Sequence, residues 1–120
     1  MGKLTTHVLD VSSGIPAAGV RIQLHALNGR SGDRPELLLE VVTGPDGRCV
    51  SPLLDGPAFA SGRYSLTFHL GEYFRSRGVV LPDPAFFDEA AIRFGIASPE
   101  QHYHVPLLIT PWSYSVYRGG

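Results

Sequence analysis

The chain carries, over residues 102–120, the run His102-Tyr-His-Val-Pro-Leu-Leu-Ile-Thr-Pro-Trp-Ser-Tyr-Ser-Val-Tyr-Arg-Gly-Gly120. Residues typical of strands stand on both sides of its Thr-Pro-Trp break, which predicts two strands joined as a hairpin. Successive side chains of a strand point to opposite faces. One face of the first strand is apolar and is predicted to lie in the core: Tyr103, Val105, Leu107 and Ile109. The other face is expected to be solvated but sets histidines beside apolar residues, which indicates a site or an interface: His102, His104, Pro106 and Leu108.

The same alternation continues outward from this stretch. Val20, Ile22, Leu24 and Ala26 share one predicted inner face, and Tyr64, Leu66, Phe68 and Leu70 share another. The predicted strands are 3–11, 20–26, 37–43, 62–70, 92–97, 102–109 and 113–119. A short helix is predicted over 72–77, ended by Gly78, and a hairpin loop over 30–35. Short strands with turn signals between them favour an antiparallel β-sandwich.

A turn with a clear mechanism precedes a predicted strand at Thr43-Gly-Pro-Asp-Gly-Arg48. Pro45 presets the first turn position, and Gly47 can take the positive φ that re-enters a strand. Arg48 is then held on a rigid element, where its planar guanidinium can meet a carbonyl or an anion.

Length and composition bound the function. At 120 residues the chain is expected to form a single domain, 1–120. Its formal charge of −1 gives no case for a nucleic acid or an anionic membrane as partner. The single cysteine, Cys49, excludes an internal disulfide framework, and the N-terminus lacks the apolar stretch of a secretory signal. We expect a cytoplasmic protein.

The C-terminal run resembles that of the transthyretin-related proteins, specifically the 5-hydroxyisourate hydrolases, whose signature is His-x-His-Val-Pro-Leu-Leu followed by a terminal Tyr-Arg-Gly-Ser. The resemblance extends in order along the chain, through Leu4-Thr-Thr-His-Val-Leu-Asp10, Gly14-Ile-Pro-Ala-Ala18, the 43–48 turn, Tyr64-Ser-Leu-Thr-Phe68 and Glu72-Tyr-Phe74. One position departs from the family pattern: Gly120 stands where the family usually has serine.

This resemblance implies an all-β, transthyretin-type sandwich of two four-stranded sheets with one short helix. It implies a homotetramer, a dimer of dimers, with its sites in a channel between dimers. The implied reaction is hydrolytic ring opening of 5-hydroxyisourate to 2-oxo-4-hydroxy-4-carboxy-5-ureidoimidazoline, a step of urate degradation that needs no cofactor and no metal.

The resemblance also implies the site residues. His7, Arg48 and His104 are expected to be catalytic and to bind substrate, and Tyr117 and Gly120 to contact substrate with them. Histidine suits proton transfer near neutral pH, and an arginine can neutralise charge developing on a carbonyl oxygen. Either histidine could be the base toward water. Arg118 is expected either to shape the floor of the site or to anchor the chain end.

Other interpretations remain at this point. The main alternative is a non-catalytic, transthyretin-like tetramer that binds small ligands, and a further one is a purely structural β-sandwich module. His102 and His104, with His7, could in principle hold a metal ion, although no acidic residue or cysteine stands in the motif. His25 and His69 are expected to face solvent. Cys49 is expected to pack as a small hydrophobic residue on the face opposite Arg48.

Overall fold

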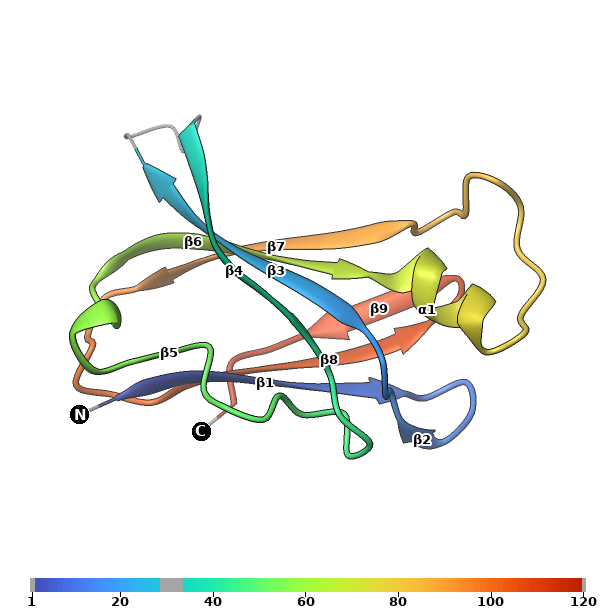
Figure 1. Cartoon of the computed structure of the whole chain (residues 1–120), viewed down its shortest axis with the longest axis horizontal. Coiled ribbons are helices and arrows are strands. Elements are labelled where there is room, and N and C mark those ends of the chain that lie inside the picture. The colour runs from blue at the N-terminus through green and yellow to red at the C-terminus, as the bar shows by residue number, and fades with distance from the viewer. Residues whose placement is uncertain (1, 29–33, 120) are drawn as a thin grey trace.

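Two β-sheets pack face to face in the computed structural model, which describes residues 2–28 and 34–119 (Figure 1). The first sheet is antiparallel throughout. In spatial order its strands are β4 (Arg34–Val42), β3 (Arg21–Asn28), β6 (Gly62–His69) and β7 (Glu89–Ile96). The hairpin loop predicted over 30–35 lies for the most part outside the described residues.

The second sheet is built around β1 and carries the candidate site. Its long strands are β1 (Lys3–Asp10), β8 (Tyr103–Thr110) and β9 (Ser113–Val116). Two strands of two residues, β2 (Ile15–Pro16) and β5 (Leu54–Asp55), pair antiparallel with β1. β1 and β8 run parallel, whereas β8 and β9 form the predicted hairpin.

The all-β sandwich with one short α-helix is thus confirmed, with differences in detail. The second sheet contains five strands rather than four. The sequence did not predict β2 and β5, because strands of two residues are too short to show a period of two. A 3₁₀ turn, Gly56–Ala58, follows β5. The helix α1 spans Leu70–Ser76 and begins two residues before its predicted start. Within the described residues no helix is long and apolar enough to cross a membrane.

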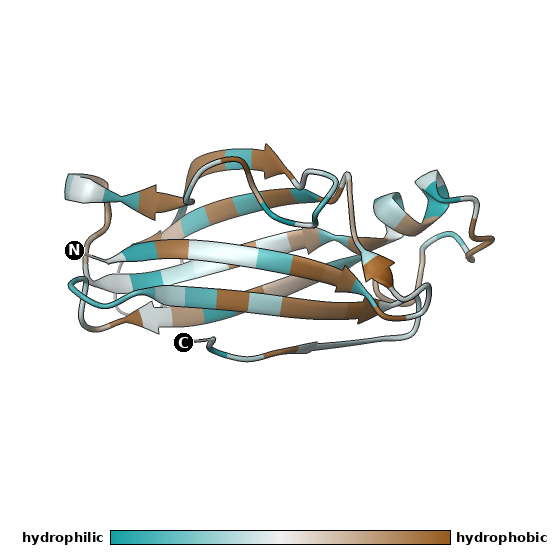
Figure 2. Cartoon of the chain, turned by 90° about the horizontal axis from the view of Figure 1, so that it is seen from below, coloured by the Kyte–Doolittle hydropathy of each residue, from teal (hydrophilic) through white to brown (hydrophobic). Residues whose placement is uncertain are grey.

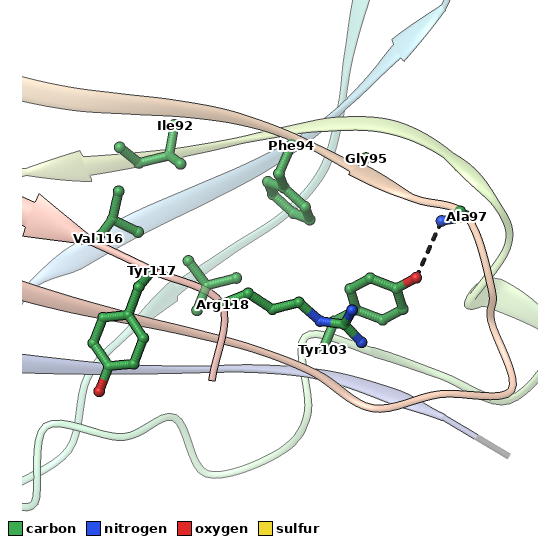
Figure 3. A pocket seen from close by; sticks show the side chains of 9 residues that line it. Ile92, Phe94, Gly95, Ala97, Tyr103, Val116, Tyr117 and Arg118 are labelled. Atoms are coloured by element: carbon green, nitrogen blue, oxygen red, sulfur yellow. Dashed lines mark hydrogen bonds between the residues drawn. The ribbon is translucent and has the colours of Figure 1, made fainter. Parts of the chain in front are cut away.

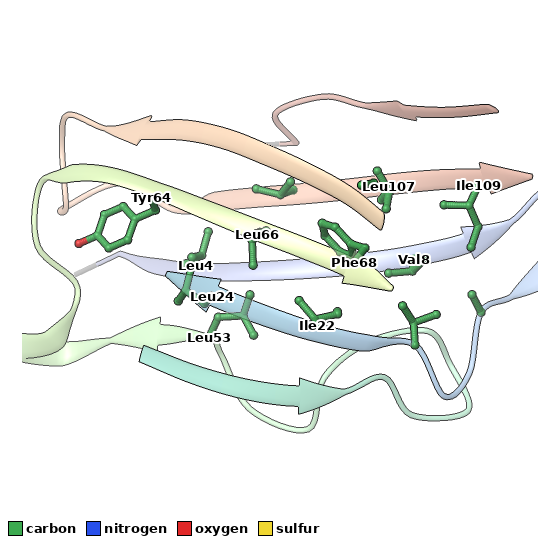
Figure 4. Close-up of a cluster of buried hydrophobic side chains, with 14 of the residues drawn as sticks. Leu4, Val8, Ile22, Leu24, Leu53, Tyr64, Leu66, Phe68, Leu107 and Ile109 are labelled. Atoms are coloured by element: carbon green, nitrogen blue, oxygen red, sulfur yellow. The ribbon is translucent and has the colours of Figure 1, made fainter. Parts of the chain in front are cut away.

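The core fills the space between the sheets (Figure 4). The predicted inner faces of β3, β6 and β8 contribute many of its side chains, and β1 adds Leu4 and Val8. The alternation of apolar and polar residues is visible along the strands in Figure 2. Almost no surface is exposed on Leu4, Val8, Ile22, Leu24, Leu66, Phe68, Leu107 and Ile109. Burial of each large apolar side chain stabilises the fold by about 1.5–3 kcal/mol relative to exposure. This packing fixes which face of β1 and β8 is left for the site.

His69 corrects a prediction, since it was expected to face solvent and is buried. Its Nε2 lies 3.0 Å from Gln23 Oε1, and its Nδ1 lies 3.3 Å from Arg21 Nη2. Arg21 also binds Glu72 of α1, so these polar groups cover the histidine. His25 is half-buried. Alternation placed both rings on the outer face correctly but could not show that long neighbours cover one of them.

Candidate active site

The parallel pairing of β1 with β8 brings the two predicted histidines to one surface. Thr5 is the register partner of His104, and His7 is the partner of Pro106. Thr6 and Val8 point into the core. Alternation therefore puts Thr5, His7 and His104 together on the outer face of the second sheet.

Arg48 lies on the other side of His7 from β8. It forms an antiparallel bridge with His7, and the Val8 N–H donates to the Gly47 carbonyl at 2.9 Å. Gly47 has φ of +78°, as the turn predicted. A side chain there would run into the Val8 carbonyl oxygen, so glycine is needed for this close approach. The turn thus holds an exposed arginine directly beside a site histidine.

The same turn also fixes the ring of His7. His7 Nε2 lies 2.9 Å from the backbone carbonyl oxygen of Asp46. A carbonyl can only accept a hydrogen bond, so Nε2 must carry the proton that it donates. In its neutral form His7 therefore keeps its lone pair on Nδ1.

His104 is held on two edges of its ring. Its Nδ1 lies 2.8 Å from Thr5 Oγ1. On the other edge, a Cβ added to Gly119 would lie 2.8 Å from His104 Cδ2, so the backbone passes closely over the ring. Burial, together with the positive charges of Arg48 and His7, lowers the pKa of His104 below its usual 6.5, although a hydrogen bond with the Thr5 backbone opposes this. The imidazole is therefore neutral at neutral pH.

The C-terminal segment leaves the regular ladder with β8 opposite Pro106, a residue of β8. The predicted strand 113–119 ends at Val116, yet the Gly119 N–H donates to the His104 carbonyl at 2.7 Å. Backbone groups alternate along a strand, so the nitrogen of Pro106 also faces this edge and has no proton to offer to the segment opposite it. The ladder therefore opens between Val116 and Gly119.

Within that opening Tyr117 and Arg118 point in opposite directions (Figure 3). Tyr117 is largely exposed. The Arg118 guanidinium lies 4.1 Å from the centre of the Tyr103 ring and donates to the His102 carbonyl at 3.1 Å. Arg118 thus anchors the chain end, as one of its two predicted roles required. Gly120 lies outside the described residues.

Two hollows lie near these residues, one beside Arg48 and one beside Arg118. A hollow of about 150 Å³ opens beside Thr5 and Arg48 and is walled by residues 49–52. A larger one, of about 400 Å³ and mostly apolar, lies on the inner side of the chain end between β7 and Arg118, away from the histidines. Cys49 is half-buried against the core, as expected, and burial raises the pKa of its thiol. In the described part of the chain no three His, Cys, Asp or Glu side chains gather to hold a metal ion.

The structure adds three contacts to the predicted set: the Thr5 hydroxyl, the Asp46 carbonyl and the close backbone of Gly119. Thr5 precedes His7 by two positions, so alternation places it on the same face. Its partner His104 is 99 positions away, however, and only the parallel register joins them. The contact of Asp46 is made by its backbone and leaves no sign in the sequence, whereas the close approach at Gly119 is marked only by the glycine.

This fold and site define a member of a known family of β-sandwich proteins. The chain belongs to the HIUase/Transthyretin family, whose model matches residues 4–119. The 5-hydroxyisourate hydrolase of Pseudomonas aeruginosa is 53% identical over 99% of this chain and 92% of that protein. The structure of Klebsiella pneumoniae 5-hydroxyisourate hydrolase matches with a TM-score of 0.81 and 36% identity, over 100% of both chains.

A crystal structure of (S)-allantoin synthase is also similar, with a TM-score of 0.91 and 47% identity. The match covers 99% of this chain and 44% of that one. This chain therefore corresponds to less than half of the (S)-allantoin synthase chain, and to nearly the whole of the two hydrolases.

Proposed function

We propose that this chain hydrolyses 5-hydroxyisourate to 2-oxo-4-hydroxy-4-carboxy-5-ureidoimidazoline. In this reaction water adds to an acyl carbon, the carbon–nitrogen bond of the ring breaks, and the leaving nitrogen takes a proton. The observation that carries the proposal is the shared outer face of His7 and His104, with Arg48 bridged to His7. The relatives named 5-hydroxyisourate hydrolase match this chain over nearly its whole length.

The geometry supports different roles for the two histidines. His104 has Nδ1 engaged by Thr5 and is neutral at neutral pH, so it suits the base that takes a proton from water. His7 Nε2 donates to the Asp46 carbonyl, so the turn holds this ring and only its Nδ1 has a lone pair. We assign His7 and Arg48 to binding the ring and to stabilising negative charge on its oxygen. Tyr117 and Gly120 are proposed to contact the substrate from the chain end.

The test is to generate 5-hydroxyisourate in place from urate with urate oxidase and to follow its ultraviolet decay. The wild-type chain should accelerate the decay, and His104→Asn should abolish most of the acceleration. His25→Asn changes a histidine of the opposite sheet and should retain wild-type activity. Decay no faster than the spontaneous rate with the wild type would refute the proposal and favour the ligand-binding alternative.

The homotetramer is proposed on the character of the same face. Leu9 and Leu108 are half-buried beside the polar site residues on the outer face of the second sheet, and Tyr117 is exposed. An apolar surface around a site is typical of an interface between subunits. Light scattering at micromolar concentration should give four times the chain mass, and a stable monomer would contradict this.

A cytoplasmic location is proposed because Cys49 is the only cysteine of the chain and is a free thiol. Proteins of oxidising compartments more often carry paired cysteines. Fractionation of cells that express the chain should recover it with the cytosol, and recovery outside the cytosol would contradict the proposal.

A further inference from the structure

Thr5 makes the one side-chain hydrogen bond that the described structure records for the ring of His104, at 2.8 Å between Oγ1 and Nδ1. Both residues sit on regular strands paired in register, so the contact is set by rigid elements. Thr5 itself belongs to a half-buried, outward-facing position of β1. It is therefore placed to control the ring without contributing to the core.

The geometry around the ring leaves one atom for chemistry. The Nδ1 edge faces Thr5, and the Cδ2 edge faces the backbone of Gly119. A half-turn of the ring would put a carbon against the Thr5 hydroxyl and lose the hydrogen bond. The ring is thus held in one orientation, with Nε2 as the only nitrogen that protein groups do not engage in the described structure.

We propose that Thr5 is the positioning residue of His104, accepting the Nδ1 proton so that Nε2 is the atom that exchanges protons with water and substrate. This inference rests on the proposed hydrolase function. With Nδ1–H donated to Thr5 Oγ1, neutral His104 has its lone pair on Nε2 and can take a proton from the attacking water. The imidazolium that forms keeps the same Nδ1–H bond and can return the Nε2 proton to the leaving nitrogen.

The choice of a hydroxyl has its own consequence. A carboxylate at this position would fix the same orientation but would favour the charged imidazolium. Charged His104 would then stand among the positive groups that already surround it, Arg48 above all. A neutral hydroxyl holds the ring without favouring the charged form, which suits a base that acts near neutral pH.

The experiment compares Thr5→Val, which keeps the shape and removes the hydroxyl, with Thr5→Ser, which keeps the hydroxyl. Thr67→Val is the matched control, a threonine on the outer face of the opposite sheet. We expect Thr5→Val to lower kcat by about 10- to 100-fold with KM changed by less than about twofold. Thr5→Ser should stay within about threefold of the wild type, and Thr67→Val should match it.

Nitrogen-15 NMR of the His104 ring supplies a readout that general loosening of the fold would not produce. Above the pKa of His104, the wild type and Thr5→Ser should show the Nδ1–H tautomer, and Thr5→Val a mixture or the Nε2–H tautomer. A wild-type ring protonated on Nε2 would overturn the inference, even if Thr5→Val did not fold. So would wild-type kcat in folded Thr5→Val. A wild-type chain without hydrolase activity would instead refute the proposed function, and the tautomer would still test the Thr5 contact.

Discussion

At the scale of single residues, the environment of His104 sets the pH range in which it can act as the proposed base. Burial is the main cause of its lowered pKa, and the charges of Arg48 and His7 act in the same direction. A general base must be unprotonated to accept a proton. Its active form therefore persists to a lower pH than an unperturbed histidine would allow.

The pH profile of kcat/KM should accordingly fall on the acid side with a midpoint below 6.5, because activity is complete above the lowered pKa and is lost as the pH falls through it. Arg48→Gln removes a positive neighbour and should move this midpoint upward, in addition to lowering the rate. Arg93→Gln, on the opposite sheet, should leave the midpoint in place. A wild-type midpoint at or above 6.5 would contradict the assignment.

Gly119→Ala should damage the site rather than the fold. The added methyl group would lie 2.8 Å from His104 Cδ2 and 3.3 Å from its Cβ, so the ring or the chain end has to move. A displacement of about 1 Å can cost about 100-fold in rate. We expect kcat to drop at least tenfold in the decay assay. Gly95→Ala, where nothing lies closer than 4.0 Å to the new methyl group, should have wild-type kcat.

At the scale of elements, two irregularities place the groups of the candidate site. Pro106 opens the ladder between β8 and the chain end, and the turn before Arg48 brings that residue against β1. Both depend on backbone properties of one residue, the missing proton of proline and the positive φ of Gly47. The regular parts of β1 and β8 supply the surface, and these irregular parts bring the remaining groups to it.

Gly47→Ala tests the turn. An alanine at φ of +78° costs about 1–2 kcal/mol, and its Cβ would also run into the Val8 carbonyl, which adds about 1–3 kcal/mol. Gly14→Ala carries the same backbone cost at φ of +70° with open space around the new atom. Urea denaturation should show a clearly larger loss of unfolding free energy for Gly47→Ala. Equal losses for the two variants would show that the close approach to β1 contributes nothing.

The elements also show what the sequence can predict. Alternation identified the inner faces of β3, β6 and β8, because a period of two is local and strong. It gave no information on the parallel pairing of β1 and β8, which joins residues about 99 positions apart. The predicted strand 113–119 was too long, although Pro106 in the facing strand already carried the reason. His69 was misplaced because its cover comes from other strands and from α1.

At the scale of the whole molecule, one buried hydrogen bond joins the second sheet to α1. The Tyr73 hydroxyl donates to Asp10 Oδ2 at 2.9 Å. Burial and the bond to Asp10 raise the pKa of Tyr73 to about 12. Burial alone would raise the pKa of the Asp10 carboxyl, but hydrogen bonds from Ser12, Tyr73 and Ser13 bring it below 3.8. The ionised carboxylate is thus the form that the fold stabilises.

Tyr73→Phe should lower the unfolding free energy at pH 7 by about 1.5–3 kcal/mol, the usual range for a hydrogen bond to a charged group. The lowered pKa of Asp10 contributes stability above pH 3.8 that is lost as the pH falls through the folded-state value. The difference between variant and wild type should therefore shrink in acid. Tyr64→Phe removes a hydroxyl that donates to the neutral Ala60 carbonyl, and its smaller effect should not vary with pH. Denaturation curves at several pH values measure both.

The close contact between the Gly119 backbone and the His104 ring also decides at which end of the chain a purification tag should be placed. Any peptide fused behind the C-terminus has to leave from a backbone already pressed against the imidazole. A purification tag at that end would crowd the proposed site, so a low rate measured on such a fusion would reflect the tag. The affinity handle belongs at the N-terminus, where Gly2 is bound to the Pro99 carbonyl instead.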